Sequence, residues 1–258
     1  MILIQPSIDP VILSIGALDI RWYSLSYIMA FVIGSFLIKK FNKEFSNSIS
    51  NKEIDNFFLW AILGVIIGGR LGYVIFYQTN IFILDPLHIF KIWKGGMSFH
   101  GGLAGMIVSI YFFCKKNKLS FFYLADLVSL VAPIGLFFGR IANFINTELY
   151  GRITDFPFAV IYPSIDQFPR HPSQLYEAFF EGFLLFTILL YYFYKKKENE
   201  LIGKISGLFL LLYSFFRFSI EYLREPDAHL GLFLGYFSMG QLLSVPLFIF
   251  GILIFVKK

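Results

Sequence analysis

The sequence predicts an all-α polytopic membrane protein with seven transmembrane helices and small outer-face loops. Of the 258 residues, 57% are hydrophobic and 15% are charged, whereas a soluble domain carries about 25% charged residues. The apolar residues come in blocks of about twenty, a length that crosses a hydrocarbon core of about 30 Å. A backbone surrounded by lipid must satisfy its own hydrogen bonds, so these blocks are expected to be helical.

Seven blocks have the required length, and we expect the whole chain, 1–258, to form one transmembrane domain. The predicted spans are residues 22–38, 56–77, 98–114, 121–144, 175–194, 205–223 and 237–256. Small residues in "GVIIGGRLG" and "GGLAGM" recur at spacings of three and four, which lets helix backbones approach closely.

The first twenty residues precede these spans and differ from them. They have no basic region and are interrupted by Pro6, Asp9 and Pro10, so we do not interpret them as a signal peptide. We expect residues 1–20 to form an interfacial segment on the outer face. Within it, "VILSIGALDI" alternates around Gly16 and predicts a hairpin.

Basic residues are distributed unevenly between the two sides of the predicted spans. One side holds thirteen lysines: Lys39, Lys40, Lys43, Lys52, Lys115, Lys116, Lys118, Lys195, Lys196, Lys197, Lys204, Lys257 and Lys258. The other side holds six basic residues: Arg21, Lys91, Lys94, Arg152, Arg170 and Arg224. The positive-inside rule therefore places the carboxyl terminus in the cytoplasm and the amino terminus outside. The same asymmetry explains the net charge of +5 without a nucleic-acid partner.

The sequence gives no indication of a disulfide, a metal or a cofactor. Cys114 is the only cysteine, and the histidines are scattered without the spacing of a zinc site. We therefore expect no metal and no cofactor.

Polar side chains within the predicted spans lie mainly in the outer half. They are Tyr23, Arg70, His100, Arg140, Asn143, Gln174, Glu177, Glu181, Tyr213, Arg217, Glu221 and Gln241. A charged side chain at mid-bilayer costs about 2.5–3.5 kcal/mol, so the three arginines are expected to face the bundle interior. They either pair with Glu177, Glu181 and Glu221 to hold helices together, or they also bind an anionic ligand. The one-sided clustering favours a cavity that opens to the outer leaflet.

Three functions were compared for such a cavity. A transporter needs polar residues along a path to both sides, often with an internal repeat, and neither is present. A retinal photoreceptor needs a lysine within the last span, which has none before Lys257. An enzyme of an anionic phospholipid needs a cationic pocket, and arginine binds phosphate through a planar fork. The residues alone favour this enzyme, and an anionic-lipid binding protein or transporter without chemistry stays open.

The resemblance of several sequence motifs to a known family makes the predicted function more specific. Residues 139–151, "GRIANFINTELYG", fit the pattern G-R-x-[GA]-N-F-x-N-x-E-x-x-G of the prolipoprotein diacylglyceryl transferase family. Further stretches resemble the same family in the same order: "RWYSLSY", "GGRLGYV", "GGMSFHGGL", "RHPSQLYEA" and "FRFSIEYLREPD". Several independent motifs match in the same order, so the sequence is similar to this family over nearly the whole chain.

The resemblance implies an activity and its partners. The family transfers the diacylglyceryl group of phosphatidylglycerol to the lipobox cysteine of a prolipoprotein signal peptide and releases glycerol phosphate. It implies a multi-pass protein of the bacterial inner membrane, in contact with membrane lipids, whose active site faces the outer leaflet. Residues 145–172 are then an outer loop that covers the site.

The resemblance also implies roles for particular residues. The catalytic group comprises His100, Arg140, Tyr213 and Arg217, with the two arginines holding the phosphate. The substrate-binding group comprises Tyr23, Arg70, Asn143, Asn146, Glu148, Gly151 and Glu221. We expect Gly151 to allow a backbone conformation that other residues avoid. The base remains open, because a histidine with a pKa near 6.5 accepts a thiol proton, while an arginine field also stabilises a thiolate.

Overall fold

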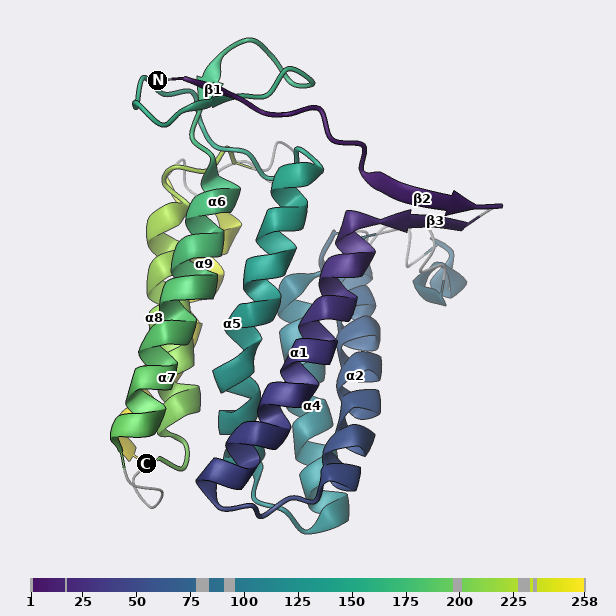
Figure 1. Cartoon of the computed structure of the whole chain (residues 1–258), viewed down its shortest axis with the longest axis vertical. Coiled ribbons are helices and arrows are strands. Elements are labelled where there is room, and N and C mark those ends of the chain that lie inside the picture. The colour runs from purple at the N-terminus through teal and green to yellow at the C-terminus, as the bar shows by residue number, and fades with distance from the viewer. Residues whose placement is uncertain are drawn as a thin grey trace. The chain divides into compact units, whose positions relative to one another are not determined.

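The computed structural model describes residues 2–16, 18–77, 84–90, 96–196, 201–226, 233 and 236–257, which are largely helical (Figure 1). The chain divides into two compact units. Unit 1 comprises Met1–Leu37 and Val128–Lys258, and unit 2 comprises Ile38–Leu127. Two long helices, α1 (Trp22–Phe45) and α5 (Phe121–Ile145), begin in one unit and end in the other.

Five helical stretches are long and apolar enough to cross a membrane. They are Trp22–Phe45, Asn51–Ile75, Phe121–Ile145, Ser173–Lys195 and Met239–Lys257. They coincide with five of the predicted spans, which confirms a mainly helical, multi-pass membrane protein. The two remaining predicted spans are also helices, α4 (Phe99–Asn117) and α8 (Lys204–Ile220).

Unit 2 is built around two antiparallel helices, α2 (Asn51–Tyr77) and α4, which lie side by side. Their glycines explain how closely they pack. A Cβ atom at Gly105 would lie 2.0 Å from the carbonyl oxygen of Gly64, and one at Gly68 would lie 2.3 Å from that of Gly101. Backbone therefore touches backbone here, as the glycine spacing predicts. A short 3-10 helix, η1 (Pro86–Phe90), lies between them in sequence.

Unit 1 contains the fifth predicted span as one helical stretch in three parts: α6 (Ser173–Glu177), η3 (Ala178–Leu184) and α7 (Leu185–Lys195). The middle part, η3, is a π-helix, a conformation that is rare and concentrated at functional sites. Its Gly182 packs on α5, because a Cβ atom there would lie 2.6 Å from the Cβ of Phe137. The last two helices, α8 and α9 (Met239–Lys257), pack through Gly207 and Gly251 in the same way.

The segment before α1 forms the predicted hairpin. Strands β2 (Val11–Ile15) and β3 (Leu18–Arg21) pair antiparallel, and Gly16 adopts a φ of +62° between them. A left-handed turn residue of this kind favours glycine.

A small sheet joins the amino terminus to the loop that follows α5. Its strands are β1 (Leu3–Ile4), β4 (Val160–Ile161) and β5 (Pro169–Arg170), in the order β1-β4-β5. The side chain of Gln5 reinforces it by donating from Nε2 to the carbonyl of Phe144 at 2.5 Å and accepting from Thr147 Oγ1 at 3.0 Å. This parallel pairing of β1 with β4 was not predicted, and it fixes the amino-terminal segment to residues 145–172 (Figure 1).

Candidate active site

Six ionisable side chains of unit 1 form an arginine–glutamate cluster. Its members are Arg140 on α5, Glu177 on α6, Glu181 on η3, Arg217 on α8, and Glu221 and Arg224 directly after α8. Three positive and three negative groups balance in charge, as buried ionised groups require. All six come from unit 1, although α5 and α8 are far apart in sequence.

Glu177 lies at the centre of the cluster. Its Oε2 is 3.1 Å from Nε of Arg140, and its Oε1 accepts a hydrogen bond from Nη1 of Arg217. The carboxylate is fully buried, and both guanidinium groups are more than four-fifths buried. Two arginines from different helices therefore converge on one carboxylate.

Each of these arginines also contacts a second glutamate. Nη2 of Arg140 donates to Oε2 of Glu181 at 3.3 Å, and Nη2 of Arg217 lies 2.7 Å from Oε2 of Glu221. Arg224 approaches the same Glu221 oxygen at 3.7 Å. Within the part of the chain that the structure describes, Oε1 of Glu181 is buried without a hydrogen-bond partner.

The motif of residues 139–151 connects directly to this cluster. Nη1 of Arg140 lies 3.5 Å from Oδ1 of Asn143, whose Nδ2 donates to Oε2 of Glu148 at 2.9 Å. Asn146 donates to the other Glu148 oxygen at 3.4 Å. Four polar residues of the motif thus form one chain of hydrogen bonds that begins at the cluster and ends in the loop.

The turn that carries Glu148 has an unusual backbone. Thr147 and Leu149 adopt φ angles of 59° and 58°, a left-handed conformation that costs non-glycine residues about 1–2 kcal/mol each. Two side chains of α6 hold the turn. Ser173 Oγ donates to the carbonyl of Leu149 at 2.7 Å, and Gln174 Nε2 donates to the carbonyl of Glu148 at 2.6 Å. The surrounding structure therefore fixes a strained turn beside the cluster, as occurs at functional sites.

Gly151 is required for a different reason from the one expected. Its φ is not among the positive values, so it does not adopt a conformation reserved for glycine. Instead, two backbone segments flank it. A Cβ atom would lie 2.4 Å from the carbonyl oxygen of His171 and 2.7 Å from that of Leu223. Close packing, not a special φ, is what excludes a side chain here.

Arg170 ties the outer loop together next to Gly151. Its guanidinium donates to both carboxylate oxygens of Asp166, to the carbonyl of Gly151 at 3.2 Å and to Glu225 at 3.3 Å. The hydrogen bonds from Arg170 to Asp166 lower the pKa of the Asp166 carboxyl. The ring of Tyr150 lies 5.0 Å from the same guanidinium. Arg170 was counted only as a basic residue of the outer side. It is in fact buried, and its hydrogen bonds hold the outer loop in place.

Two further predicted site residues of unit 1 are tyrosines. Tyr213 is buried one turn before Arg217 and stacks on Phe209, with the ring centroids 5.8 Å apart. Tyr23 is half-buried near the start of α1, and its hydroxyl accepts from that of Tyr27 at 3.4 Å.

Arg70 and His100 belong to unit 2. Arg70 is buried in α2, where Nε donates to the carbonyl of Ile89 at 3.1 Å and Nη1 to that of Gly96 at 3.4 Å. His100 lies half-buried in the first turn of α4, whose amino end is capped by Ser98. The contacts that join the other candidate residues lie within unit 1.

Three members of the cluster were not predicted as site residues. Glu177 and Glu181 were expected only as structural partners, although their spacing on one helix face and their depth in a span indicate function by themselves. Arg224 was counted among the outer loop charges, yet it is only 6% exposed and approaches Glu221. Its spacing of three residues from Glu221 was the available signal.

Comparisons with known proteins agree on one family. The sequence profile described as "Prolipoprotein diacylglyceryl transferase" matches residues 10–257. A protein of Rickettsia felis named phosphatidylglycerol–prolipoprotein diacylglyceryl transferase is 50% identical over 246 residues, which cover 95% of each chain. A Rickettsia bellii protein of the same name is 49% identical over 252 residues, covering 98% of this chain and 96% of its own. A third, from Rickettsia canadensis, is 50% identical and covers 96% of both chains.

Proposed function

The chain belongs to the prolipoprotein diacylglyceryl transferase family, and we propose that it transfers the diacylglyceryl group of phosphatidylglycerol to the lipobox cysteine of prolipoproteins. The cysteine thiolate attacks the glyceryl carbon that carries the phosphate ester. A C–S bond forms while the C–O bond to the phosphate breaks, and glycerol phosphate leaves with the electron pair. The thiol proton passes to a base. The reaction is the first step of lipoprotein maturation.

The convergence of Arg140 and Arg217 on Glu177 is the observation that carries this proposal. Negative charge grows on the leaving phosphate in the transition state, so fixed cations beside it lower the barrier. Two guanidinium groups offer paired donors that suit a phosphate. Glu177 is a positioning residue in this account, because one carboxylate holds both arginines at a set separation before substrate binds.

The remaining residues of unit 1 act around these arginines in the proposal. Asn143, Asn146 and Glu148 orient Arg140 and the polar end of the lipid, and Gly151 lets the loop close over them. Glu221 orients Arg217, Tyr213 supplies a buried hydroxyl one turn away, and Tyr23 binds substrate.

For Arg70 and His100 the proposal rests on the family resemblance alone. Arg70 is assigned to substrate binding and His100 to accepting the thiol proton. An arginine-stabilised thiolate is the competing account of deprotonation. The pH dependence of transfer by a His100→Gln variant separates the two. If His100 is the base, the variant loses most of the activity that rises through the pKa of the imidazole, whereas an arginine-stabilised thiolate leaves the pH profile unchanged.

The proposed topology has seven spans, with the amino terminus outside and the carboxyl terminus in the cytoplasm of a bacterial inner membrane. The thirteen-to-six distribution of basic residues supports it. In this topology the cluster lies toward the outer leaflet, residues 145–172 cover it, and residues 1–20 lie at the outer interface.

The experiment is a transfer reaction with purified protein in detergent. Phosphatidylglycerol and a peptide with a lipobox cysteine should yield a peptide that is heavier by one diacylglyceryl group, together with an equal amount of glycerol phosphate. A matched peptide with serine in place of the cysteine should give neither product. If the protein binds phosphatidylglycerol but produces no modified peptide, the alternative of a lipid-binding protein without chemistry gains support.

A further inference from the structure

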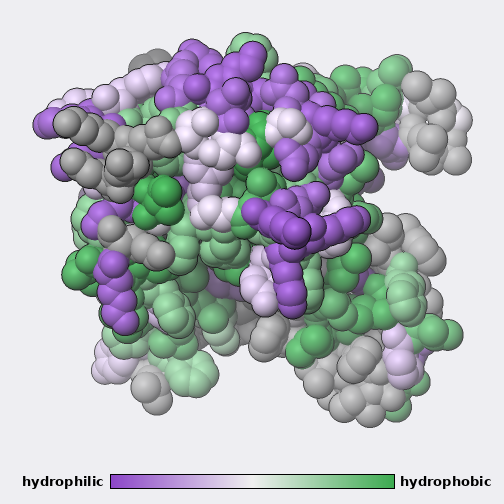
Figure 2. Space-filling model, turned by 90° about the horizontal axis from the view of Figure 1, so that it is seen from below, coloured by the Kyte–Doolittle hydropathy of each residue, from purple (hydrophilic) through white to green (hydrophobic). Residues whose placement is uncertain are grey.

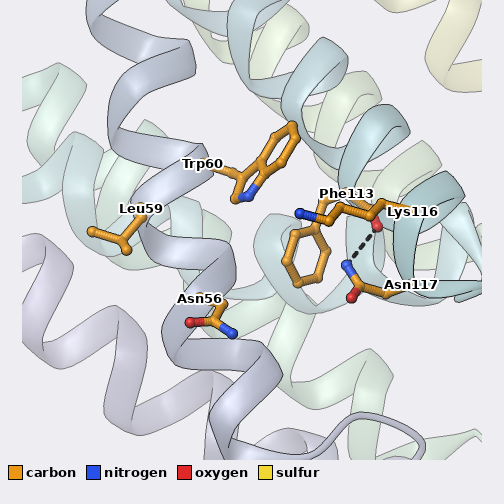
Figure 3. Close-up of a pocket in the computed structure, with 6 residues that line it drawn as sticks. All are labelled: Asn56, Leu59, Trp60, Phe113, Lys116 and Asn117. Carbon is orange, nitrogen blue, oxygen red and sulfur yellow. Dashed lines mark hydrogen bonds between the residues drawn. The ribbon is translucent and has the colours of Figure 1, made fainter.

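A polar pocket lies in unit 2, in the half of α2 and α4 away from Arg70. It has a volume of about 290 Å³. Its lining residues are Asn56, Leu59 and Trp60 of α2 and Phe113, Lys116 and Asn117 of α4 (Figure 3). Nothing in the proposed transfer reaction uses these side chains.

The pocket exists because the tight packing of α2 on α4 ends there. At Gly64 the helices touch, since a Cβ atom would lie 2.0 Å from Oγ of Ser109. One turn further along, Trp60 and Phe113 stand between the helices, with ring centroids 6.2 Å apart. Large aromatic side chains in place of glycine keep the backbones apart and leave a hollow lined by polar ends.

Lys116 supplies the charge of this pocket. Its ammonium lies 5.7 Å from the centroid of the Trp60 ring, which orients it across the hollow from α4 toward α2 (Figure 3). Among the described residues, no carboxylate lies within ion-pair distance of it. A lysine ammonium has three N–H donors, and the contact with the ring face leaves them available to an anion.

Two amides complete the polar lining. The Asn117 Nδ2 donates to the carbonyl of Phe113 at 2.8 Å, which fixes that side chain at the edge of the pocket. Asn56 lies exposed on α2 on the opposite side of the hollow (Figure 3). One cation, two amides and an indole ring form a set of groups suited to a phosphate.

The surroundings indicate that this phosphate belongs to a lipid. From Lys116, the same face of α4 continues through the exposed residues Phe112 and Val108 at four-residue spacing. From Leu59, the same face of α2 continues through the exposed residues Leu63 and Ile67. Apolar side chains on both helices thus lead away from a charged pocket, as acyl chains lead away from a headgroup.

The end of unit 2 that holds the pocket is also basic. Its exposed lysines are Lys40, Lys43, Lys52, Lys115, Lys116 and Lys118. Figure 2, which views the molecule from below Figure 1, shows hydrophilic residues among the side chains on the face turned toward the viewer. Basic residues and tryptophan mark a membrane interface, and basic pockets between transmembrane helices bind anionic headgroups.

We propose that the Asn56–Trp60–Lys116–Asn117 pocket binds the phosphate headgroup of an anionic phospholipid, at a site separate from the transfer reaction. In the topology proposed above, this lipid lies in the cytoplasmic leaflet. Lys116 forms a charge-assisted hydrogen bond to the phosphate, the two amides donate to its other oxygens, and the acyl chains lie along α2 and α4.

The test measures how strongly lipid protects Lys116 from acetylation. The full-length protein is placed in nanodiscs of phosphatidylcholine alone, of phosphatidylcholine with phosphatidic acid, or of phosphatidylcholine with inorganic phosphate in solution. Acetic anhydride labels lysines briefly, and mass spectrometry quantifies each one. Phosphatidic acid should slow labelling of Lys116 by about tenfold, as one charge-assisted hydrogen bond implies. The neighbouring exposed Lys115, which does not line the pocket, is the internal control and should change little.

Two variants separate the pocket from the general charge of the surface. Asn56→Leu, an exposed substitution, should remove most of the protection of Lys116. By native mass spectrometry, Lys116→Gln should retain one phosphatidic acid fewer than Lys115→Gln. Equal protection of Lys115 and Lys116 would overturn the proposal, and so would protection by inorganic phosphate that matches the lipid. Phosphatidylglycerol and transfer are absent from every arm, so the result is independent of the proposed catalytic activity.

Discussion

The guanidinium of Arg140 on α5 and that of Arg217 on α8 contact the two oxygens of one carboxylate, Glu177, although 77 positions separate the arginines in sequence. The arginines were expected to converge on a phosphate, and they converge first on a side chain. This arrangement has a physical advantage, because two like charges held close together in a span need a compensating charge before the substrate arrives.

Replacing Glu177 should therefore harm both stability and transfer. Glu177→Gln removes the shared negative charge while keeping a similar shape, so the two arginines lose a buried partner. Breaking a buried ion pair typically costs about 3–5 kcal/mol. The measurement is unfolding in mixed micelles together with the transfer rate. Glu225→Gln is the matched control, since this glutamate is about half exposed where it contacts Arg170 and should lose less than about 1 kcal/mol. Equal losses in the two variants would contradict the central position of Glu177.

A methyl group at Gly151 should not fit. Gly151→Ala places a Cβ against the carbonyl oxygens of His171 and Leu223, so backbone on both sides must move. Overpacking of this kind costs about 1–3 kcal/mol, and the loop that carries Glu148 should shift with it. Thermal unfolding and transfer rate should both fall. Gly139→Ala is the control within the same motif, because its Cβ meets nothing within 4 Å and its melting temperature should not fall. A fully stable and active Gly151→Ala would show that the loop tolerates the movement.

The only cysteine should have no chemical role. Cys114 is buried near the end of α4, in unit 2, and the reacting thiol belongs to the prolipoprotein. Cys114→Ser should keep a near-normal transfer rate, measured with the same peptide. A folded but inactive Cys114→Ser enzyme would indicate a covalent enzyme intermediate and refute direct attack by the substrate thiol.

Single-cysteine labelling should establish the orientation. In the Cys114→Ser background, a cysteine at Ser164 in the outer loop should react with an impermeant maleimide added to intact spheroplasts. A cysteine at Lys52, at the beginning of α2, should react only after the membrane is opened. Both positions are exposed, so accessibility to water is matched. The reverse pattern would invert the topology and place the cluster toward the cytoplasm.

The helices were predictable because a backbone surrounded by lipid has few ways to satisfy its hydrogen bonds. A run of apolar residues must be helical to satisfy its backbone, and the expected spans lie within or close to α1, α2, α4, α5, α8 and α9. The fifth span was found as a helix, but its π-helical middle was not. The pattern of hydrophobic residues indicates which stretches of the chain lie in the membrane. It does not indicate whether the backbone hydrogen bonds of a helix follow the α or the π pattern, and that pattern orients Glu177 and Glu181.

Side-chain partnerships were less predictable than helices. Because Arg140 and Arg217 lie within predicted spans, each was expected to have a carboxylate nearby. Glutamates of the cluster were named as possible partners, but which glutamate contacts which arginine was not predicted. Arg224 and Arg170 were counted as loop charges, because their burial depends on how the outer loop folds back on Gly151. The pairing of β1 with β4 depends on contacts between strands of two residues, which are too short to give a periodic pattern.

The most direct test of the account is the rate of diacylglyceryl transfer by purified Arg140 and Arg217 variants. Loss of one stabilising donor typically costs about 10²–10³ in rate, so Arg140→Ala and Arg217→Ala should each lose at least that much while remaining folded and membrane-inserted. Lysine keeps the charge without the planar fork, so Arg→Lys at either position should also impair transfer. More phosphatidylglycerol should not restore the rate, since the contact acts in the transition state.

Arg21→Ala is the matched control for this measurement. Arg21 is an exposed arginine at the end of β3 whose guanidinium lies 3.9 Å from the exposed Asp19, and a surface substitution should change the rate by no more than about twofold. We expect large losses at Arg140 and Arg217 and a near-normal rate at Arg21. If Arg140→Ala and Arg217→Ala each retain more than about a tenth of the wild-type rate, well above the loss expected for a transition-state contact, the two arginines only hold the helices together. The assignment of the phosphate site would then be wrong.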